Sequence, residues 1–284
     1  MASSPTPPPP AETARNGNSD DGSKGEGLLM IDLERVRKSL IRQEDSIVFS
    51  LIERAKFPSN SSLYKSSSSS QIPGFDGSLI QYIVKETEIL HSKIGRYESP
   101  EEHPFFPDGL PLPLIPCPPK SPELLHGAAS SININSTIWK FYLEELLPLF
   151  TKQGDGDASS YACTAVCDLN CLQALSRRIH YGKFVAEVKF RDAPEEYGPA
   201  IRAQDRDALM KLLTFEDVEE MVKKRVAKKA MIFSQEVNLI EKDADDKQQN
   251  CKIDPSLLSR LYGEWVMPLT KLVQVEYLLR RLDK

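Results

Sequence analysis

The stretch LQALSRRIHYGKFVAEVKF (172–190) decides the fold and places two cations on one helical face. Arg178 and Lys189 are eleven residues apart, which is about three helical turns, so both lie on the same face roughly 16 Å apart along the axis. Gly182, Val185 and Ala186 lie between them on that face. Two cations above a floor of small side chains predict a cradle for a small dianion.

Helical periodicity continues outward from this stretch in both directions, and no strand pattern competes with it. Pro268 should kink the last helix, whose second half is apolar around most of its circumference and is expected to be buried. We therefore predict an all-α, multi-helix bundle. The expected helices cover about 30–57, 77–95, 137 onward, 160–191 as one long helix, a short helix capped by Asp205, 214–240 with Thr214 as its hydroxyl cap, and 255–283.

Composition places the chain among ordinary globular proteins, with 284 residues and a net charge of −5. Residues 1–28 are expected to form a disordered tail, and residues 29–284 one helical domain. The charge gives no nucleic-acid footprint, and no run reaches the roughly 20 apolar residues of a membrane span. The tail is Ser-rich but carries acids, which transit peptides avoid, so we expect a cytosolic protein, with a plastid location as the alternative.

Five cysteines, an odd number, indicate free thiols in a reducing compartment. Cys163, Cys167 and Cys171 follow one another at intervals of four, so they should stack along one helix as small buried residues. Zinc thiolates come instead as close pairs flanking a turn, and no histidine spacing suggests a metal. We expect no metal site.

Several polar residues interrupt the apolar stripes of the other predicted helices. Arg37 shares a stripe with Ile41 and Val48, and Glu219 lies among valines. Thr270 and Gln274 form an i,i+4 pair on the apolar last helix. Taken singly, each has a structural explanation, because long cations extend from the edge of an apolar stripe to solvent and a buried amide can bind backbone. Together they favour a polar site, since buried charges need partners or a ligand.

The same regions closely resemble eukaryotic chorismate mutases, and most of all the plant enzymes. The similar blocks, which occur in the same order and cover about 30–284, are VRKSLIRQEDSIVFSLIERAKF (36–57), RYESPEEHPFFPD (96–108), the opening stretch 172–190 and PLTKLVQVEYLLRRLD (268–283). The resemblance implies an all-helical homodimer that rearranges chorismate to prephenate in phenylalanine and tyrosine biosynthesis. It implies a pericyclic reaction without a cofactor or a covalent intermediate.

The resemblance also assigns roles to residues of this chain. Arg37 and Arg178 match carboxylate-binding arginines, and a guanidinium suits that role because it can grip a carboxylate with two hydrogen bonds. Lys189 matches a lysine that contacts the ether oxygen and a carboxylate. Glu219 matches the acid that holds the ring hydroxyl, and Thr270 a hydroxyl that lines the substrate site.

Two positions of the implied substrate site depart from the fungal pattern. Gln274 stands where that pattern has a glutamate facing the ether oxygen, and an amide donates a hydrogen bond at any ordinary pH. Activity should therefore persist through neutral and mildly alkaline pH. Phe215 replaces an asparagine, so the side-chain role is lost there, while its backbone N–H near a helix start could still serve.

The effector site of regulated family members, where tyrosine or tryptophan binds, is degenerate in this chain. Ala162 and Cys163 stand in place of a Gly-Ser pair, and Gly95 and Arg96 in place of an Arg-Arg pair. These changes block close backbone approach and remove a carboxylate grip, so we expect an enzyme insensitive to aromatic amino acids. The alternatives are a regulated plastid enzyme and a non-catalytic helical scaffold, and the scaffold would be expected to lose the charged cradle.

Overall fold

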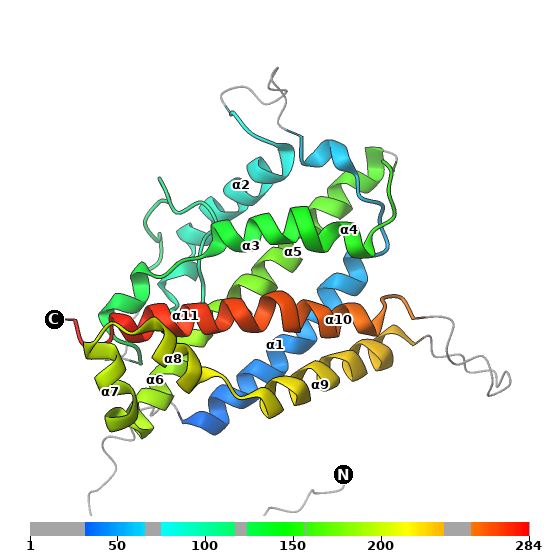
Figure 1. Ribbon diagram of the computed structural model, residues 1–284. Coiled ribbons are helices and arrows are strands. Elements are labelled where there is room, and N and C mark those ends of the chain that lie inside the picture. The colour runs from blue at the N-terminus through cyan, green and yellow to red at the C-terminus, as the bar shows by residue number, and fades with distance from the viewer. Residues whose placement is uncertain (1–31, 66–74, 117–123, 157, 236–250, 284) are drawn as a thin grey trace, which may run out of the picture. The chain divides into compact units, whose positions relative to one another are not determined.

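Two long helices, α1 (Leu33–Arg54) and α5 (Ala158–His180), pack against each other along much of their length (Figure 1). The computed structural model describes residues 32–65, 75–116, 124–156, 158–235 and 251–283, within the unit Ile31–Lys284. These residues form helices and connecting segments without a strand, which confirms the predicted all-α class. No described helix has the length and apolarity to cross a membrane.

Side-chain caps fix where several helices begin. Asp32 accepts a hydrogen bond from the Arg35 backbone N–H at 2.7 Å and starts α1. Ser78 starts α2 (Leu79–Lys93) with a reciprocal capping box through Gln81. Asp205 caps α8 (Arg206–Leu213) as predicted. Each cap satisfies backbone N–H groups that have no partner within the first helical turn.

The predicted single helix 160–191 is in fact two helices. It divides at Tyr181 into α5 and α6 (Gly182–Asp192), and the junction tightens to an i→i+3 bond from the Phe184 N–H to the Tyr181 carbonyl. The break places Gly182 against the C-terminal helix. A Cβ at Gly182 would lie 2.7 Å from the Thr270 carbonyl oxygen, so only glycine permits this approach.

The last helix also differs from the prediction. It comprises α10 (Pro255–Leu261), a π-helical turn η6 (Tyr262–Val266) and α11 (Met267–Leu279) (Figure 1). Pro268 lies in the first turn of α11 and lacks an N–H, and the wider π turn precedes it with an i→i−5 bond from Met267 to Tyr262. The predicted burial of the second half is confirmed, since most α11 side chains are buried.

A second helical rod repeats this construction. The segment runs through α3 (Asn135–Phe141), the π turn η4 (Tyr142–Leu146) and α4 (Leu147–Phe150), and Pro148 again follows the π turn. The two rods meet where the Phe141 and Trp265 rings stack with centroids 6.1 Å apart. The Trp265 indole also donates to Glu145 at 3.0 Å, so the π turns contact each other.

The connection from α6 to α9 (Glu216–Ser234) holds a helix that the periodicity did not predict. This is α7 (Pro194–Arg202), with Pro194 in its first turn and Pro199 inside it. Thr214 does not cap α9 as predicted, because its hydroxyl donates back to the Met210 carbonyl and Phe215 takes the N-cap position. The predicted continuation of α9 is wrong at Gln235, whose backbone is extended, and residues 236–240 lie outside the described residues.

The cysteine stripe is only partly buried. Cys163 is exposed, Cys167 is intermediate and Cys171 is buried, so the expectation of three buried thiols is wrong for the first. Thr164 and Ala165 beside Cys163 are buried, so the helix stays against the core, and the gradient arises because a spacing of four residues turns each side chain by about 40° around the axis. Within the core, Asp168 pairs with Arg54 at 2.6 Å and accepts from Tyr64 and Tyr142, so this buried charge is fully partnered.

Candidate active site

Arg178 is a buried cation without a carboxylate partner among the described residues. It lies near the end of α5, and its side chain is 5% exposed. Its Nη1 donates to Thr270 Oγ1 at 3.3 Å, while its Nε is buried without a hydrogen bond. Its guanidinium also lies 5.8 Å from the centre of the Tyr262 ring. A buried guanidinium with open donor positions is arranged to receive an anion.

Gln274 lies one turn beyond Thr270 on α11 and is also buried. Its Nε2 donates weakly to the Thr270 carbonyl at 3.4 Å, and its Oε1 has no partner. A buried amide with an unsatisfied atom costs free energy unless a ligand or water pairs with it. The close approach of Gly182 brings α6 against this pair, because a Cβ there would lie 3.3 Å from Gln274 Cγ. Gly182 therefore contacts α11, whereas the sequence suggested an open floor.

Lys189, near the end of α6, forms no ion pair with any described residue. Its Nζ lies 4.3 Å from the centre of the Phe215 ring. The pKa of Lys189 is lowered to about 8, chiefly by burial and next by the charge of Arg37, while the charges of Glu196 and Glu219 act in the opposite direction. Arg37 itself is exposed on α1 and has no hydrogen bond within the described residues. The structure thus brings Arg37, Lys189 and Glu219 into one electrostatic neighbourhood.

Glu219, in the first turn of α9, has a partner that sequence reasoning missed. Lys271 of α11 binds it at 2.8 Å and also reaches the Thr214 hydroxyl at 3.3 Å. Lys271 neutralises the carboxylate and fixes its position between α9 and α11. The available signal was the position of Lys271 beside Thr270 on a helix that is otherwise almost wholly apolar.

A second unpredicted ion cluster joins α1 to α9. Glu44 is 1% exposed and accepts two hydrogen bonds from Arg225, at 2.6 and 2.9 Å. Lys229 approaches the same carboxylate at 3.1 Å. Its signal was a carboxylate on an apolar stripe of the first helix, which must find a cation. The cluster holds together the two helices that carry Arg37 and Glu219.

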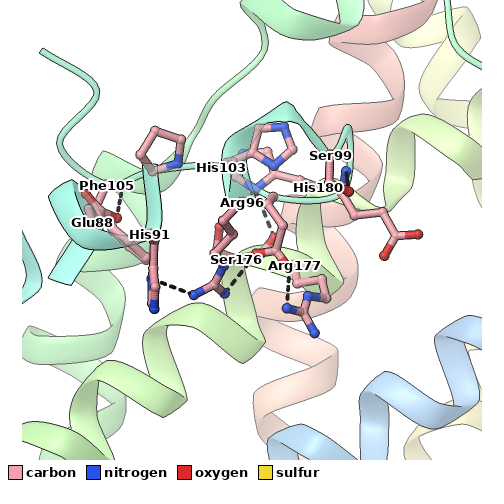
Figure 2. Close-up of polar contacts among 12 residues, drawn as sticks. Glu88, His91, Arg96, Ser99, His103, Phe105, Ser176, Arg177 and His180 are labelled. Atoms are coloured by element: carbon pink, nitrogen blue, oxygen red, sulfur yellow. Dashed lines mark hydrogen bonds and ion pairs between the residues drawn. The ribbon is translucent and has the colours of Figure 1, made fainter. Parts of the chain in front are cut away.

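The four residues of the predicted effector site do not converge within this chain. Gly95 adopts a left-handed conformation with φ of 79°, and Arg96 donates twice to Glu102, at 2.9 and 3.0 Å (Figure 2). Arg96 also contacts His91, and Arg177 of α5 binds the same Glu102. Ala162 lies fifteen residues before Arg177 on α5, which is roughly 22 Å along the axis. Both Ala162 and Cys163 are exposed.

The segment that follows Arg96 is tied down by buried groups. Glu88 of α2 accepts hydrogen bonds from the Phe105 and Phe106 backbone N–H groups at 2.6 and 2.9 Å (Figure 2). Burial raises the pKa of Glu88 to about 7. Just before Phe105, His103 stacks on His180 of α5 with ring centroids 4.1 Å apart. These contacts fix the proline-rich connection against α2 and α5.

Comparison with known proteins identifies the family of this chain. The family model described as chorismate mutase type II matches residues 161–275. "Chorismate mutase 2" of Petunia hybrida is 65% identical over 89% of this chain and 94% of the relative. The Arabidopsis thaliana protein of the same name is 60% identical over 95% of this chain and 100% of the relative.

Solved structures agree in fold. The crystal structure of AtCM1 with tyrosine bound in an allosteric site has a TM-score of 0.78 and 54% identity, over 93% of this chain and 99% of that chain. Aro7p chorismate mutase from Candida albicans, in complex with L-Trp, has a TM-score of 0.81 and 40% identity, over 89% of this chain and 92% of that chain. The chain belongs to the eukaryotic type II chorismate mutases of the plant group, and it is an isomerase.

Proposed function

We propose that this enzyme rearranges chorismate to prephenate at a site between α1, α5, α6, α9 and α11, and that it does so without regulation by aromatic amino acids. The observation that carries the location is Arg178, a buried guanidinium without an acidic partner among the described residues. A dicarboxylate supplies the missing anion. The exposed Arg37 at the end of α1 is placed to bind the second carboxylate.

The remaining residues contact the ether oxygen and the ring hydroxyl of the substrate. Lys189 and the Gln274 amide donate to the ether oxygen, where negative charge develops as the carbon–oxygen bond breaks. Glu219, held by Lys271, accepts from the ring hydroxyl. Thr270 orients Arg178 through the 3.3 Å contact. The three cations Arg37, Arg178 and Lys189 surround a substrate that carries two negative charges. The excess positive charge stabilises the negative charge that develops on the ether oxygen in the transition state.

Positioning of the substrate supplies the other part of the rate acceleration. Chorismate must fold its enolpyruvyl side chain over the ring before the new carbon–carbon bond can form. Two arginines on different helices can bind both carboxylates only in that compact form, so they select it from the solution mixture. Holding reacting atoms in such a conformer removes much of the entropic barrier. No proton transfer or covalent attachment is required of the protein.

The test follows the loss of chorismate absorbance with purified enzyme. Arg178→Ala should lower kcat/KM at least about 10²-fold, because it removes transition-state electrostatics from a buried site. Arg177→Ala is the matched control, since Arg177 is the adjacent α5 residue, is 40% exposed and binds Glu102 outside the proposed site. Equal losses in the two variants would contradict the proposed site.

Effector insensitivity is supported by the state of the four degenerate positions. The Arg96 guanidinium is already engaged by Glu102 and His91, so its fork is not open to an effector carboxylate. Ala162 carries a methyl group where regulated members have glycine. Millimolar tyrosine or tryptophan should leave the initial rate unchanged, and a several-fold change with either would contradict this part of the proposal.

We also propose a cytosolic location and a homodimer. The relatives called "Chorismate mutase 2" from petunia and Arabidopsis are 60–65% identical, and the maize relative called "Chorismate mutase 2, cytosolic" is 53% identical. The relatives named as chloroplastic, from Arabidopsis, petunia and maize, are 53–55% identical. A fluorescent fusion of the full chain tests the location. The dimer is what the family resemblance implies. Size-exclusion chromatography coupled to light scattering should give twice the mass of one chain.

A further inference from the structure

Phe215 is the position where the sequence predicted that a side-chain role is lost, yet its ring contacts the site. It occupies the N-cap of α9 and is 50% exposed. The Lys189 ammonium lies 4.3 Å from its ring centre, well within the distance at which a cation is attracted by an aromatic face. Among the described residues this ring is the one close contact that Lys189 makes with a group complementary to its charge.

The ring is held on fixed backbone. The Phe215 carbonyl accepts from the Glu219 N–H at 3.0 Å and thereby starts α9. Thr214 is held on both sides, because its hydroxyl donates to the Met210 carbonyl and accepts from Lys271. The linker between α8 and α9 is therefore tied to α11 as well as to its own helices. A ring carried on such a linker can define where the lysine amine lies.

The charges around Lys189 explain why it needs this support. Arg37 on α1 repels the ammonium, while Glu196 on α7 and Glu219 on α9 attract it from beyond ion-pair distance. Glu219 is engaged by Lys271, which weakens its pull. Burial also disfavours the charged amine. An aromatic face stabilises the ammonium without adding a negative charge, which would repel the dianionic substrate.

We propose that Phe215 is a positioning residue, which holds the Lys189 ammonium through its ring face so that the amine is charged and aimed at the substrate when the substrate binds. The proposal rests on the proposed function for the role of Lys189. The ring takes over by cation–π attraction a position that fungal relatives fill with a hydrogen-bonding amide. Phe215 acts through Lys189 and does not itself donate to the reacting atoms.

The first experiment measures the pKa of Lys189 without substrate, by competitive labelling of lysine amines across pH followed by peptide mass spectrometry. Phe215→Leu should lower that pKa by about half a unit, because the ammonium loses its aromatic partner. Phe215→Tyr should restore it. Phe49→Leu is the matched control, since Phe49 is also 50% exposed but stacks on Phe233 at 4.5 Å, and it should leave the Lys189 pKa unchanged.

The direction of the change in the Lys189 pKa separates this role from simple exclusion of water by the ring. If the ring only excluded water, Phe215→Leu would admit solvent and raise the pKa of Lys189, so an unchanged or raised value overturns the proposal. A second readout is the pH dependence of kcat/KM, whose alkaline limb should move with the labelling pKa and recover in Phe215→Tyr. If the wild-type protein had no chorismate mutase activity, the proposed function would be wrong. The labelling measurements on wild type and the Phe215 variants would still decide the role of Phe215.

Discussion

Lys189 sets the alkaline limit of the proposed site. Burial and the neighbouring Arg37 lower its pKa to about 8, so the free enzyme loses this ammonium as pH rises through about 8, which narrows the mildly alkaline range expected from Gln274 alone. The protonated form is the donor, and kcat/KM should therefore be constant below the pKa and fall as pH rises through about 8. Lys189→Arg should be slower but keep its charge, which extends the plateau. Profiles of kcat/KM from pH 6 to 10 test this, and a flat wild-type profile would contradict it.

Gln274 sets no pH limit on the proposed reaction, because an amide does not titrate, and that feature can be reversed. Gln274→Glu introduces a carboxyl group that donates to the ether oxygen only when protonated. Because the position is buried, the pKa of the new acid should lie above its usual value. Activity of the variant should fall as pH rises through that pKa, while wild type stays active until Lys189 titrates. An identical pH–rate profile in both proteins would exclude Gln274 as an ether-oxygen donor.

At this scale the sequence predicted individual buried polar residues better than their partners. Thr270 and Gln274 were singled out because helical spacing is a local property, and the structure places this pair against Gly182, with Thr270 bound to Arg178. Lys271 was missed because its partner Glu219 is 52 residues away in the chain. The ring of Phe215 above Lys189 depends on where a short linker lies, which no periodicity encodes.

The junction between α6 and α11 depends on Glu187. This carboxylate is fully buried, accepts from the Tyr277 hydroxyl at 2.5 Å and from Arg281 at 2.6 and 3.0 Å, and binds Arg191 at 2.5 Å. Although burial acts in the opposite direction, these donors lower its pKa. Glu187→Gln should cost about 2 kcal/mol of unfolding free energy at pH 7, since the arginines are partly hydrated.

The pH dependence of that loss follows from the lowered pKa of Glu187. Its stabilisation is complete above the ordinary carboxyl pKa of roughly 4.3 and is lost as pH falls through the folded value. The stability gap between wild type and Glu187→Gln, measured by urea unfolding, should therefore narrow below about pH 4. Tyr277→Phe removes one donor and keeps the charge, so it should cost less. A gap independent of pH would contradict this account.

Helix existence was predictable for most elements, whereas their interruptions were not. The periodicity that defines α1, α2 and α5 survives in the structure because burial follows the same period. The π turns before Pro148 and Pro268 respond to a missing backbone donor, and sequence pattern indicates a kink without its form. The sequence did not predict α7, because its two prolines, Pro194 and Pro199, are residues that usually interrupt a helix.

At the scale of the molecule, the proposed site joins helices from both ends of the described chain. Arg37 lies on α1, Arg178 on α5, Lys189 on α6, and Gln274 on α11. The ion clusters around Glu44, Glu187 and Glu219 lie at the α1–α9, α6–α11 and α9–α11 contacts. Each cluster thus fixes a pair of helices that carry residues of the proposed site, so a ligand bound there should stabilise the whole fold.

A ligand that bridges these helices should stabilise the fold globally. A non-reactive bicyclic dicarboxylate with the shape of the compact conformer binds the folded state alone, so at 100 times its Kd it adds about 2.7 kcal/mol. For a domain of this size that raises Tm by roughly 5–10 °C. Differential scanning calorimetry should show the rise in wild type and in Arg177→Ala, and almost none in Arg178→Ala. A similar rise in Arg178→Ala would mean that the dicarboxylate binds elsewhere, because only the buried guanidinium of Arg178 distinguishes the two variants at the proposed site.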